Sequence, residues 1–327
     1  MDLSIFFAGT GGSVPSARRG LPAVLVRRGG EHLLFDCGEG TQRQLMRSVG
    51  LADLDCVFLT HFHADHWLGL PGMLKSFALR ERERPLTIYG PRGLEVLMEQ
   101  TRFIYGRLPY ELTVVELDPA ETLARDGYLI GAVPVRHKGP GCLGYAIVEE
   151  ARPGHLDPEL AERLGVKPGP DFGRLQRGET VAGVAPEQVM GPTRPGRKIV
   201  ISGDTAPCEA LVVAAHESDV LVHEATFARE ETDRARQTSH STATQAAEAA
   251  RDADVRLLAL THVSTRYPGG ELRDEARAVF PATEAPRDFD TIEVPFPERG
   301  APFLVRWAER RERETPPAQP AEPVAAR

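Results

Sequence analysis

Four apolar segments of this sequence each end at a side chain that can bind a metal ion. The segments DCVFLT (55–60), YLIGAVPVR (128–136), KIVISG (198–203) and LLALT (257–261) have the aliphatic composition of short buried strands. They are followed directly by His61, His137, Asp204 and His262. Because strands in a sheet have a fixed spacing, ends that lie on one edge can bring distant residues together. The pattern predicts an α/β domain with a polar site along one sheet edge.

The first of these strand ends opens a dense histidine cluster, HFHADH, at residues 61–66. His61 and His63 alternate, so both imidazoles point the same way in an extended backbone. Asp65 and His66 follow after the chain has turned, and they can face a second point nearby. A polar surface turn would leave several imidazoles competing for partners. The spacing therefore indicates a site for two metal ions.

Each metal ion is expected to have three ligands of its own. The first ion is assigned to His61, His63 and His137, and the second to Asp65, His66 and His262, with Asp204 bridging the two. Imidazole and carboxylate ligands together suit zinc. Manganese and iron accept the same ligands. We expect two Zn²⁺ ions per subunit, with Mn²⁺ or Fe²⁺ as the open alternatives.

The motif T-H-x-H-x-D-H at residues 60–66 resembles the signature of the metallo-β-lactamase superfamily. Within it, HEAT (223–226), HST (240–242) and a Gly/Pro-rich insertion after His137 resemble the ribonuclease Z family. The resemblance covers about residues 1–300 and implies a four-layer αββα sandwich. It also implies a zinc-dependent endoribonuclease that removes the 3′ trailer from precursor tRNA, leaving a 3′-hydroxyl on the tRNA and a 5′-phosphate on the trailer. A homodimer is implied too.

The same resemblance implies roles for three residues. Asp65 becomes the general base, His240 the proton donor to the leaving 3′-oxygen, and Glu224 the carboxylate partner of His240. His240 precedes a helix start, Thr242-x-x-Gln245, that fits a capping box. Bacterial members often have Pro-x-Lys-x-Arg-Asn after the first glycine loop, whereas this chain has PSARRG at 15–20. The segment in this chain is still basic, but it has no asparagine at the last position.

The glycine-rich segment GTGGSVP (9–15) lacks the third glycine of a dinucleotide-binding loop. We expect a turn packed close to the metal site.

Residues 151–197 differ from the rest in being dense in proline and glycine. We expect them to form a protruding tRNA-binding arm with one short helix at 157–164, inserted into a single body made of residues 1–150 and 198–310. A basic excess in the arm suits an RNA backbone. The candidate RNA contacts are Lys167, Arg174 and Arg177 in the arm, and Arg266 near His262. The charged, proline-rich residues 311–327 are expected to be a disordered tail.

Charge, hydropathy and cysteine content argue against several other classes of protein. The net charge is −8 and the pI about 5.8, which argues against a surface covered by nucleic-acid-binding charge but permits a local basic patch. No segment approaches the roughly 20 apolar residues of a membrane span, and the N-terminus lacks a signal-peptide pattern. The four cysteines form no C-x-x-C pair, so we expect reduced thiols and a cytoplasmic protein.

Two other functions fit part of the pattern. A small-molecule hydrolase of the same fold, a lactonase or cyclic-nucleotide phosphodiesterase, would share the metals without needing the basic arm. A non-catalytic RNA-binding or scaffold protein would not need a complete ligand set. Deletion of residues 155–193 discriminates the first alternative, and the complete ligand set argues against the second. An Asp65→Ala variant that kept full cleavage activity would overturn the assigned base.

Overall fold

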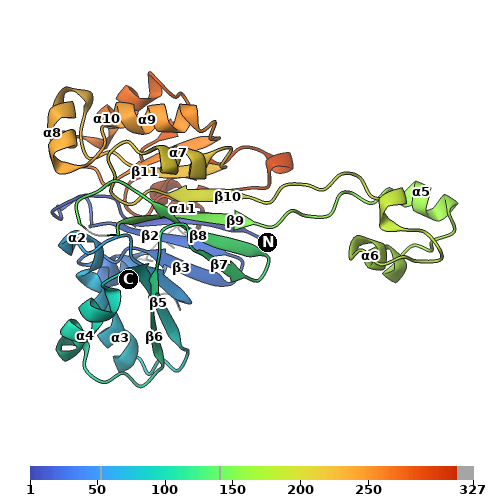
Figure 1. The fold of residues 1–327 in the computed structure, drawn as a ribbon, viewed down its shortest axis with the longest axis horizontal. Coiled ribbons are helices and arrows are strands. Elements are labelled where there is room, and N and C mark those ends of the chain that lie inside the picture. The colour runs from blue at the N-terminus through green and yellow to red at the C-terminus, as the bar shows by residue number, and fades with distance from the viewer. Residues whose placement is uncertain (52–53, 140, 315–327) are drawn as a thin grey trace, which may run out of the picture.

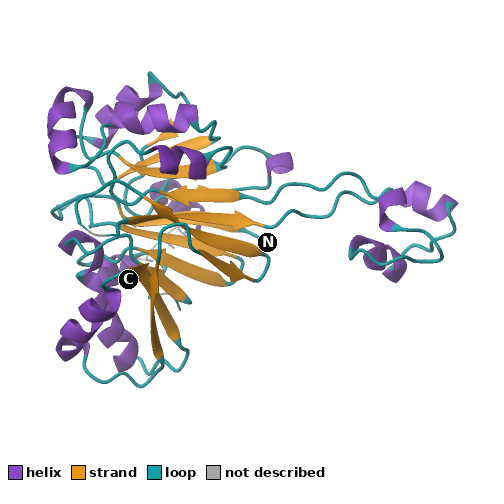
Figure 2. Cartoon of the chain, viewed as in Figure 1, coloured by secondary structure: helices purple, strands orange, loops and turns teal. Residues whose placement is uncertain are grey.

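Two β-sheets packed against each other form the centre of the protein (Figures 1 and 2). The computed structural model describes residues 1–51, 54–139 and 141–314. The first sheet has the spatial order β15 (Phe303–Val305), β14 (Thr291–Glu293), β1 (Leu3–Gly9), β2 (Ala23–Arg28), β3 (Glu31–Phe35), β4 (Cys56–Phe58), β5 (Leu86–Pro91), β6 (Leu112–Leu117). The second has the order β13 (Thr283–Glu284), β12 (Leu257–Thr261), β11 (Val220–Glu224), β10 (Lys198–Ile201), β9 (Leu143–Glu149), β8 (Tyr128–Pro134), β7 (Thr122–Arg125).

Helices cover the outer face of each sheet. The first sheet packs against α1 (Thr41–Arg47), α3 (Gly69–Leu79) and α4 (Leu94–Tyr105). The second packs against α7 (Glu209–Ala215), α9 (Ala243–Asp252) and α10 (Gly269–Arg277). The remaining helices of the body are α2 (Ala64–Trp67), α8 (Thr232–Thr238) and α11 (Trp307–Glu314), with short 3₁₀ turns at Arg229–Glu231 and Pro297–Arg299. The predicted αββα sandwich is confirmed. None of the described helices is long and apolar enough to cross a membrane.

Aromatic side chains fill the space between the sheets. The rings of Phe35 and Phe58 stack at 4.9 Å, and Tyr145 of the second sheet lies 5.5 and 5.3 Å from them. The Tyr145 hydroxyl donates to the Leu59 carbonyl at 2.7 Å. This bond satisfies the buried hydroxyl and joins the second sheet to the segment between β4 and His61.

Helix α9 follows directly from its sequence. Ala243, Ala246, Ala247 and Ala250 are buried at the i, i+3, i+4, i+7 spacing of a core-facing stripe. Their small side chains let the helix lie close to the second sheet. The predicted capping box is present: Gln245 N donates to Thr242 Oγ1 at 3.2 Å, and Thr242 N to Gln245 Oε1 at 3.0 Å. The cap sets where the helix begins, next to His240.

The segment 151–197 extends away from the body (Figure 1) and contains more structure than expected. One predicted helix is present as α5 (Pro158–Arg163), but α6 (Pro170–Gln176) and a 3₁₀ turn (Pro186–Gln188) were missed. Pro170 starts α6 at a position where the missing N–H costs nothing. A small cluster of buried side chains holds the arm together: Ala161, Val166, Leu175, Val181, Val184 and Val189.

The prediction of disorder from residue 311 is wrong for 311–314, because α11 continues to Glu314. The start of this helix is fixed to the body: Trp307 N donates to Asp290 Oδ1 at 2.9 Å, and the Trp307 ring packs 5.7 Å from Phe289. Tertiary contacts at the first turn therefore outweigh the polar composition that follows. Residues 315–327 lie outside the described residues.

Candidate metal centre

The predicted ligands lie at one edge of both sheets. The strands end slightly before them: β4 at Phe58, β8 at Pro134, β10 at Ile201 and β12 at Thr261. β10, β11 and β12 are parallel neighbours, so their ends meet at the same edge. Strand β4 of the first sheet adds His61 and the turn into α2, whose N-cap is His63.

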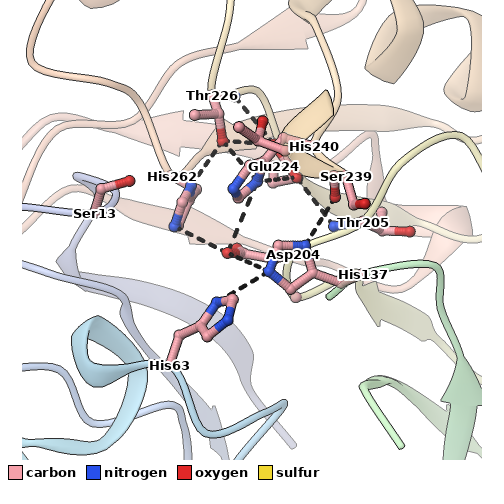
Figure 3. A network of polar contacts seen from close by, with 12 residues as sticks. Ser13, His63, His137, Asp204, Thr205, Glu224, Thr226, Ser239, His240 and His262 are labelled. Atoms are coloured by element: carbon pink, nitrogen blue, oxygen red, sulfur yellow. Dashed lines mark hydrogen bonds and ion pairs between the residues drawn. The ribbon is translucent and has the colours of Figure 1, made fainter. Parts of the chain in front are cut away.

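Asp204 lies at the centre of this cluster. Its Oδ2 is 3.3 Å from the Nε2 atoms of both His66 and His262. The Nε2 atoms of His61 and His137 lie 3.7 and 3.8 Å from the same oxygen. Figure 3 shows His137, His262 and Asp204 converging from separate elements. Two groups with donor atoms within 4.8 Å of one another match the predicted sets: His61, His63, His137 and Asp204; and Asp65, His66 and His262.

Each central histidine uses its Nδ1 atom for a second partner. His66 Nδ1 is 2.7 Å from Asp36 Oδ2, and His137 Nδ1 is 2.8 Å from the Ser239 carbonyl oxygen. His262 Nδ1 is 2.8 Å from the hydroxyl of Thr226. Such partners fix the orientation of the ring and leave Nε2 directed into the site. Metal-binding histidines have this arrangement.

Three buried polar atoms of the site have no hydrogen-bond partner among the described residues. They are His61 Nε2, His66 Nε2 and Asp204 Oδ1. An unpaired buried polar atom costs about 1–3 kcal/mol, so a cluster of them requires another ligand. Burial and the charge of His66 hold the pKa of His61 well below its ordinary value, which keeps His61 neutral. The donor set therefore fits divalent cations.

Two residues that orient the site were missed by the sequence prediction. Asp36 accepts a hydrogen bond from Thr60 N at 2.8 Å and faces His66. Thr226, the last residue of HEAT, donates to Glu224 Oε2 at 2.7 Å and also holds His262. Asp36 directly follows β3, so the strand-end pattern that identified the ligands would have found it. Thr226 was marked only as part of the HEAT motif, which did not indicate its contact with His262.

Partly exposed His240 and buried Glu224 form a pair beside the ligands (Figure 3). His240 Nδ1 lies 2.7 Å from Glu224 Oε1. Glu224 is fully buried and also accepts from Thr205 N at 3.0 Å. Burial alone would lower the pKa of His240, but the charge and hydrogen bond of Glu224 raise it to about 9. The imidazole is therefore charged at neutral pH and can donate a proton.

The glycine-rich loop after β1 packs against the site, as predicted. Ser13 N donates to Asp65 Oδ2 at 2.7 Å. A Cβ atom at Gly12 would lie 2.3 Å from His262 Nδ1, so only glycine fits there. His262 itself has φ of 55°, a left-handed conformation that costs a histidine energy. Close packing therefore holds the His262 ring in place despite the cost of this backbone conformation.

None of the predicted RNA contacts belongs to the ligand groups, and their surroundings differ. Lys167 is exposed on the arm. Arg174 and Arg177 donate to Glu179 at 2.9 and 3.3 Å. Arg266 donates to Glu231 at 3.0 Å and lines a cavity beside the site. Exposed ion pairs of this kind are weak, so phosphates can compete for these arginines.

Comparison with known proteins places this geometry in a known family. The family model described as "Metallo-beta-lactamase superfamily" matches residues 19–262. The chain is 44% identical over 302 residues to ribonuclease Z of Methanosarcina mazei, covering 90% of this chain and 99% of the relative. Ribonuclease Z of Gemmatimonas aurantiaca is 45% identical over 307 residues, covering 91% and 98%. The crystal structure of the short form of human tRNase Z has a TM-score of 0.67 at 28% identity, covering 89% and 99%.

Proposed function

Because the chain belongs to the ribonuclease Z family of the metallo-β-lactamase superfamily, we propose that it removes the 3′ trailer from tRNA precursors. The enzyme hydrolyses a phosphodiester, leaving a 3′-hydroxyl on the tRNA and a 5′-phosphate on the trailer. The observation that carries this proposal is the convergence of four histidine Nε2 atoms on Asp204 Oδ2 beside the His240–Glu224 pair.

We propose two zinc ions per chain. His61, His63 and His137 would hold one ion, and Asp65, His66 and His262 the other, with Asp204 shared between them. Bound divalent cations would activate a water molecule and neutralise the charge on the phosphoryl oxygens. Imidazole and carboxylate donors favour zinc, while manganese and iron accept the same set.

Asp65 is proposed as the base. Its carboxylate is fixed by Ser13 N at 2.7 Å and lies 3.3 Å from His262 Nε2. Although burial opposes ionisation, the hydrogen bond with His262 and the charge of His66 hold the pKa of Asp65 well below its ordinary value. The carboxylate is therefore ionised and can orient the attacking water as a hydrogen-bond acceptor. Bound cations would acidify that water, which would let even this weakly basic carboxylate take its proton.

His240 is proposed as the acid. As the bond between phosphorus and the 3′-oxygen breaks, that oxygen needs a proton, and the charged imidazole supplies it. Glu224 keeps His240 protonated and orients its ring through the 2.7 Å contact. Thr205 N and Thr226 hold Glu224 in turn, so the acid is positioned before substrate arrives.

The arm is proposed to hold precursor tRNA, and its position supports a homodimer. β9 starts at Leu143 beside the site and ends at Glu149, where the arm leaves, and β10 returns from the arm at Lys198. The arm therefore starts at the sheet end opposite Asp204 and extends outward (Figure 1). An arm in this position is suited to present RNA to the site of a second chain. We also propose a cytoplasmic location, because all four cysteines are free.

The decisive experiment is cleavage of a tRNA precursor that has a 3′ trailer, with the zinc-loaded protein and mapping of both product ends. We expect one cut that leaves a 3′-hydroxyl on the tRNA. A chain lacking residues 155–193 should lose precursor cleavage and retain hydrolysis of bis(p-nitrophenyl) phosphate. Hydrolysis of the small diester without any precursor cleavage by the intact chain would instead favour a small-molecule hydrolase.

A further inference from the structure

A basic cavity lies beside the metal centre and takes no part in the steps above. Its volume is about 820 Å³, and four separate parts of the chain line it: the loop after β1, the segment after β12, the residues directly after β13, and Arg306 after β15. Among the described residues that line it there is no carboxylate. The lining includes six arginines: Arg18, Arg19, Arg266, Arg273, Arg287 and Arg306.

Some of these arginines form ion pairs with carboxylates, and others do not. Arg306 is held by Asp290 at 2.8 Å, and Arg273 by Asp274 at the same distance. Arg18 and Arg287 are exposed and have no carboxylate partner within the part of the chain that the structure describes. An unpaired guanidinium in a concave, acid-free surface attracts anions, because its fork of donors matches the oxygens of a phosphate.

The cavity is joined to the catalytic residues through the backbone. The loop that carries Arg18 passes through Gly12, whose N–H donates to the Val263 carbonyl at 3.2 Å, and through Ser13, which holds Asp65. On the other side, the lining begins at Ser264, two residues after His262. The cavity therefore adjoins the metal centre, where an RNA strand that is cut there can reach it.

We propose that the arginine-lined cavity binds phosphodiester groups of the RNA strand close to the cut, through Arg18 and Arg287. This inference rests on the proposed function and adds a second anchoring point, independent of the arm. The bound phosphates belong either to the trailer or to the 3′ strand of the tRNA itself. A small diester has no flanking phosphates, so its hydrolysis does not use the cavity.

The test compares an Arg18→Gln, Arg287→Gln double variant with the wild type. A matched control, Arg80→Gln with Arg102→Gln, removes the same charge from exposed arginines at the ends of α3 and α4. Each zinc-loaded protein is assayed on precursors with one-nucleotide and eight-nucleotide trailers over a range of salt concentrations, and on bis(p-nitrophenyl) phosphate. The wild type establishes first whether precursor tRNA is cleaved, which tests the proposed function separately.

We expect kcat/KM of the cavity variant on the long-trailer precursor to fall roughly tenfold or more, through KM, while the small diester and the control variant are unchanged. The slope of log kcat/KM against log salt should become shallower by about 0.7 for each phosphate that the variant no longer binds. A defect that disappears with the one-nucleotide trailer assigns the phosphates to the trailer, and one that persists assigns them to the tRNA. An unchanged salt slope, or an equal loss on the small diester, overturns the proposal.

Discussion

A buried ion cluster lies where the arm joins the body, which we call the arm root. We expect Glu149→Gln to destabilise the protein strongly. Glu149 accepts hydrogen bonds from Arg197 Nε at 2.7 Å, from Arg197 Nη2 at 2.8 Å and from Arg28 Nε at 2.9 Å. Arg197 is 2% exposed. Its guanidinium also lies 4.0 Å from the ring centre of Phe296 and donates to the Val294 carbonyl. The glutamine variant preserves the shape and removes the charge.

The size of the effect follows from what remains around each arginine. Arg28 keeps Glu31 at 3.5 Å and two backbone carbonyls as partners. Arg197 keeps one carbonyl and a ring face but no carboxylate among the described residues. Leaving one buried charge uncompensated costs about 3–5 kcal/mol. At about 2–4 °C per kcal/mol, the expected fall in Tm is about 6–20 °C.

Thermal unfolding of Glu149→Gln, compared with two controls, measures this effect. In Glu298→Gln the exposed pairs with Arg152 and Arg194 are weakened at the same arm root, so its Tm should change much less. A Glu149→Met, Arg197→Met double variant removes both charges and should be more stable than the single variant. The reasoning is refuted if Glu149→Gln is no less stable than Glu298→Gln, or if the double variant shows the summed losses of its two single variants.

Four further predictions concern the site and the pH dependence of stability. His240→Ala should lower kcat on precursor tRNA about 10²–10⁴-fold, but affect bis(p-nitrophenyl) phosphate far less, since p-nitrophenolate leaves without a proton; equal losses would contradict the acid role. Asp204→Asn removes the central charge and should lower both zinc content, measured by atomic emission, and activity; an unchanged zinc content would contradict a shared ligand. Gly12→Ala should reduce activity much more than Tm, because its Cβ displaces the His262 ring from 2.3 Å away; full activity would show that the ring can shift. Burial would raise the pKa of Glu149, but its hydrogen bonds from arginine lower that pKa. The ionised Glu149 therefore stabilises the fold fully above the unfolded pKa of about 4.3, and this stabilisation is lost as the pH falls through the folded pKa. The difference in Tm between wild type and Glu149→Gln should narrow in acid, and a constant difference would contradict the reasoning.

The local sequence pattern was sufficient to predict several strands and the candidate metal ligands of this protein. The strands that end near His61, His137, Asp204 and His262 are visible as apolar runs, because burial of a strand requires continuous apolar residues. The alternation of His61 and His63 and the capping box at Thr242 depend on neighbouring residues alone. These features were enough to predict an α/β domain and to group the ligands, whereas the four-layer sandwich was implied by the resemblance of the motif at residues 60–66 to the metallo-β-lactamase superfamily.

Other features depend on contacts between residues far apart in the chain. Asp204 becomes the centre of the cluster only because β10 pairs with β9 and β11 and its end meets the turn after β4 from the other sheet. The support from Asp36 and Thr226, the second arm helix and the extension of α11 to Glu314 also escaped prediction. The six arginines of the cavity come from segments more than 200 residues apart. Sequence periodicity determines which face of an element is buried, whereas strand order and sheet packing determine which side chains meet.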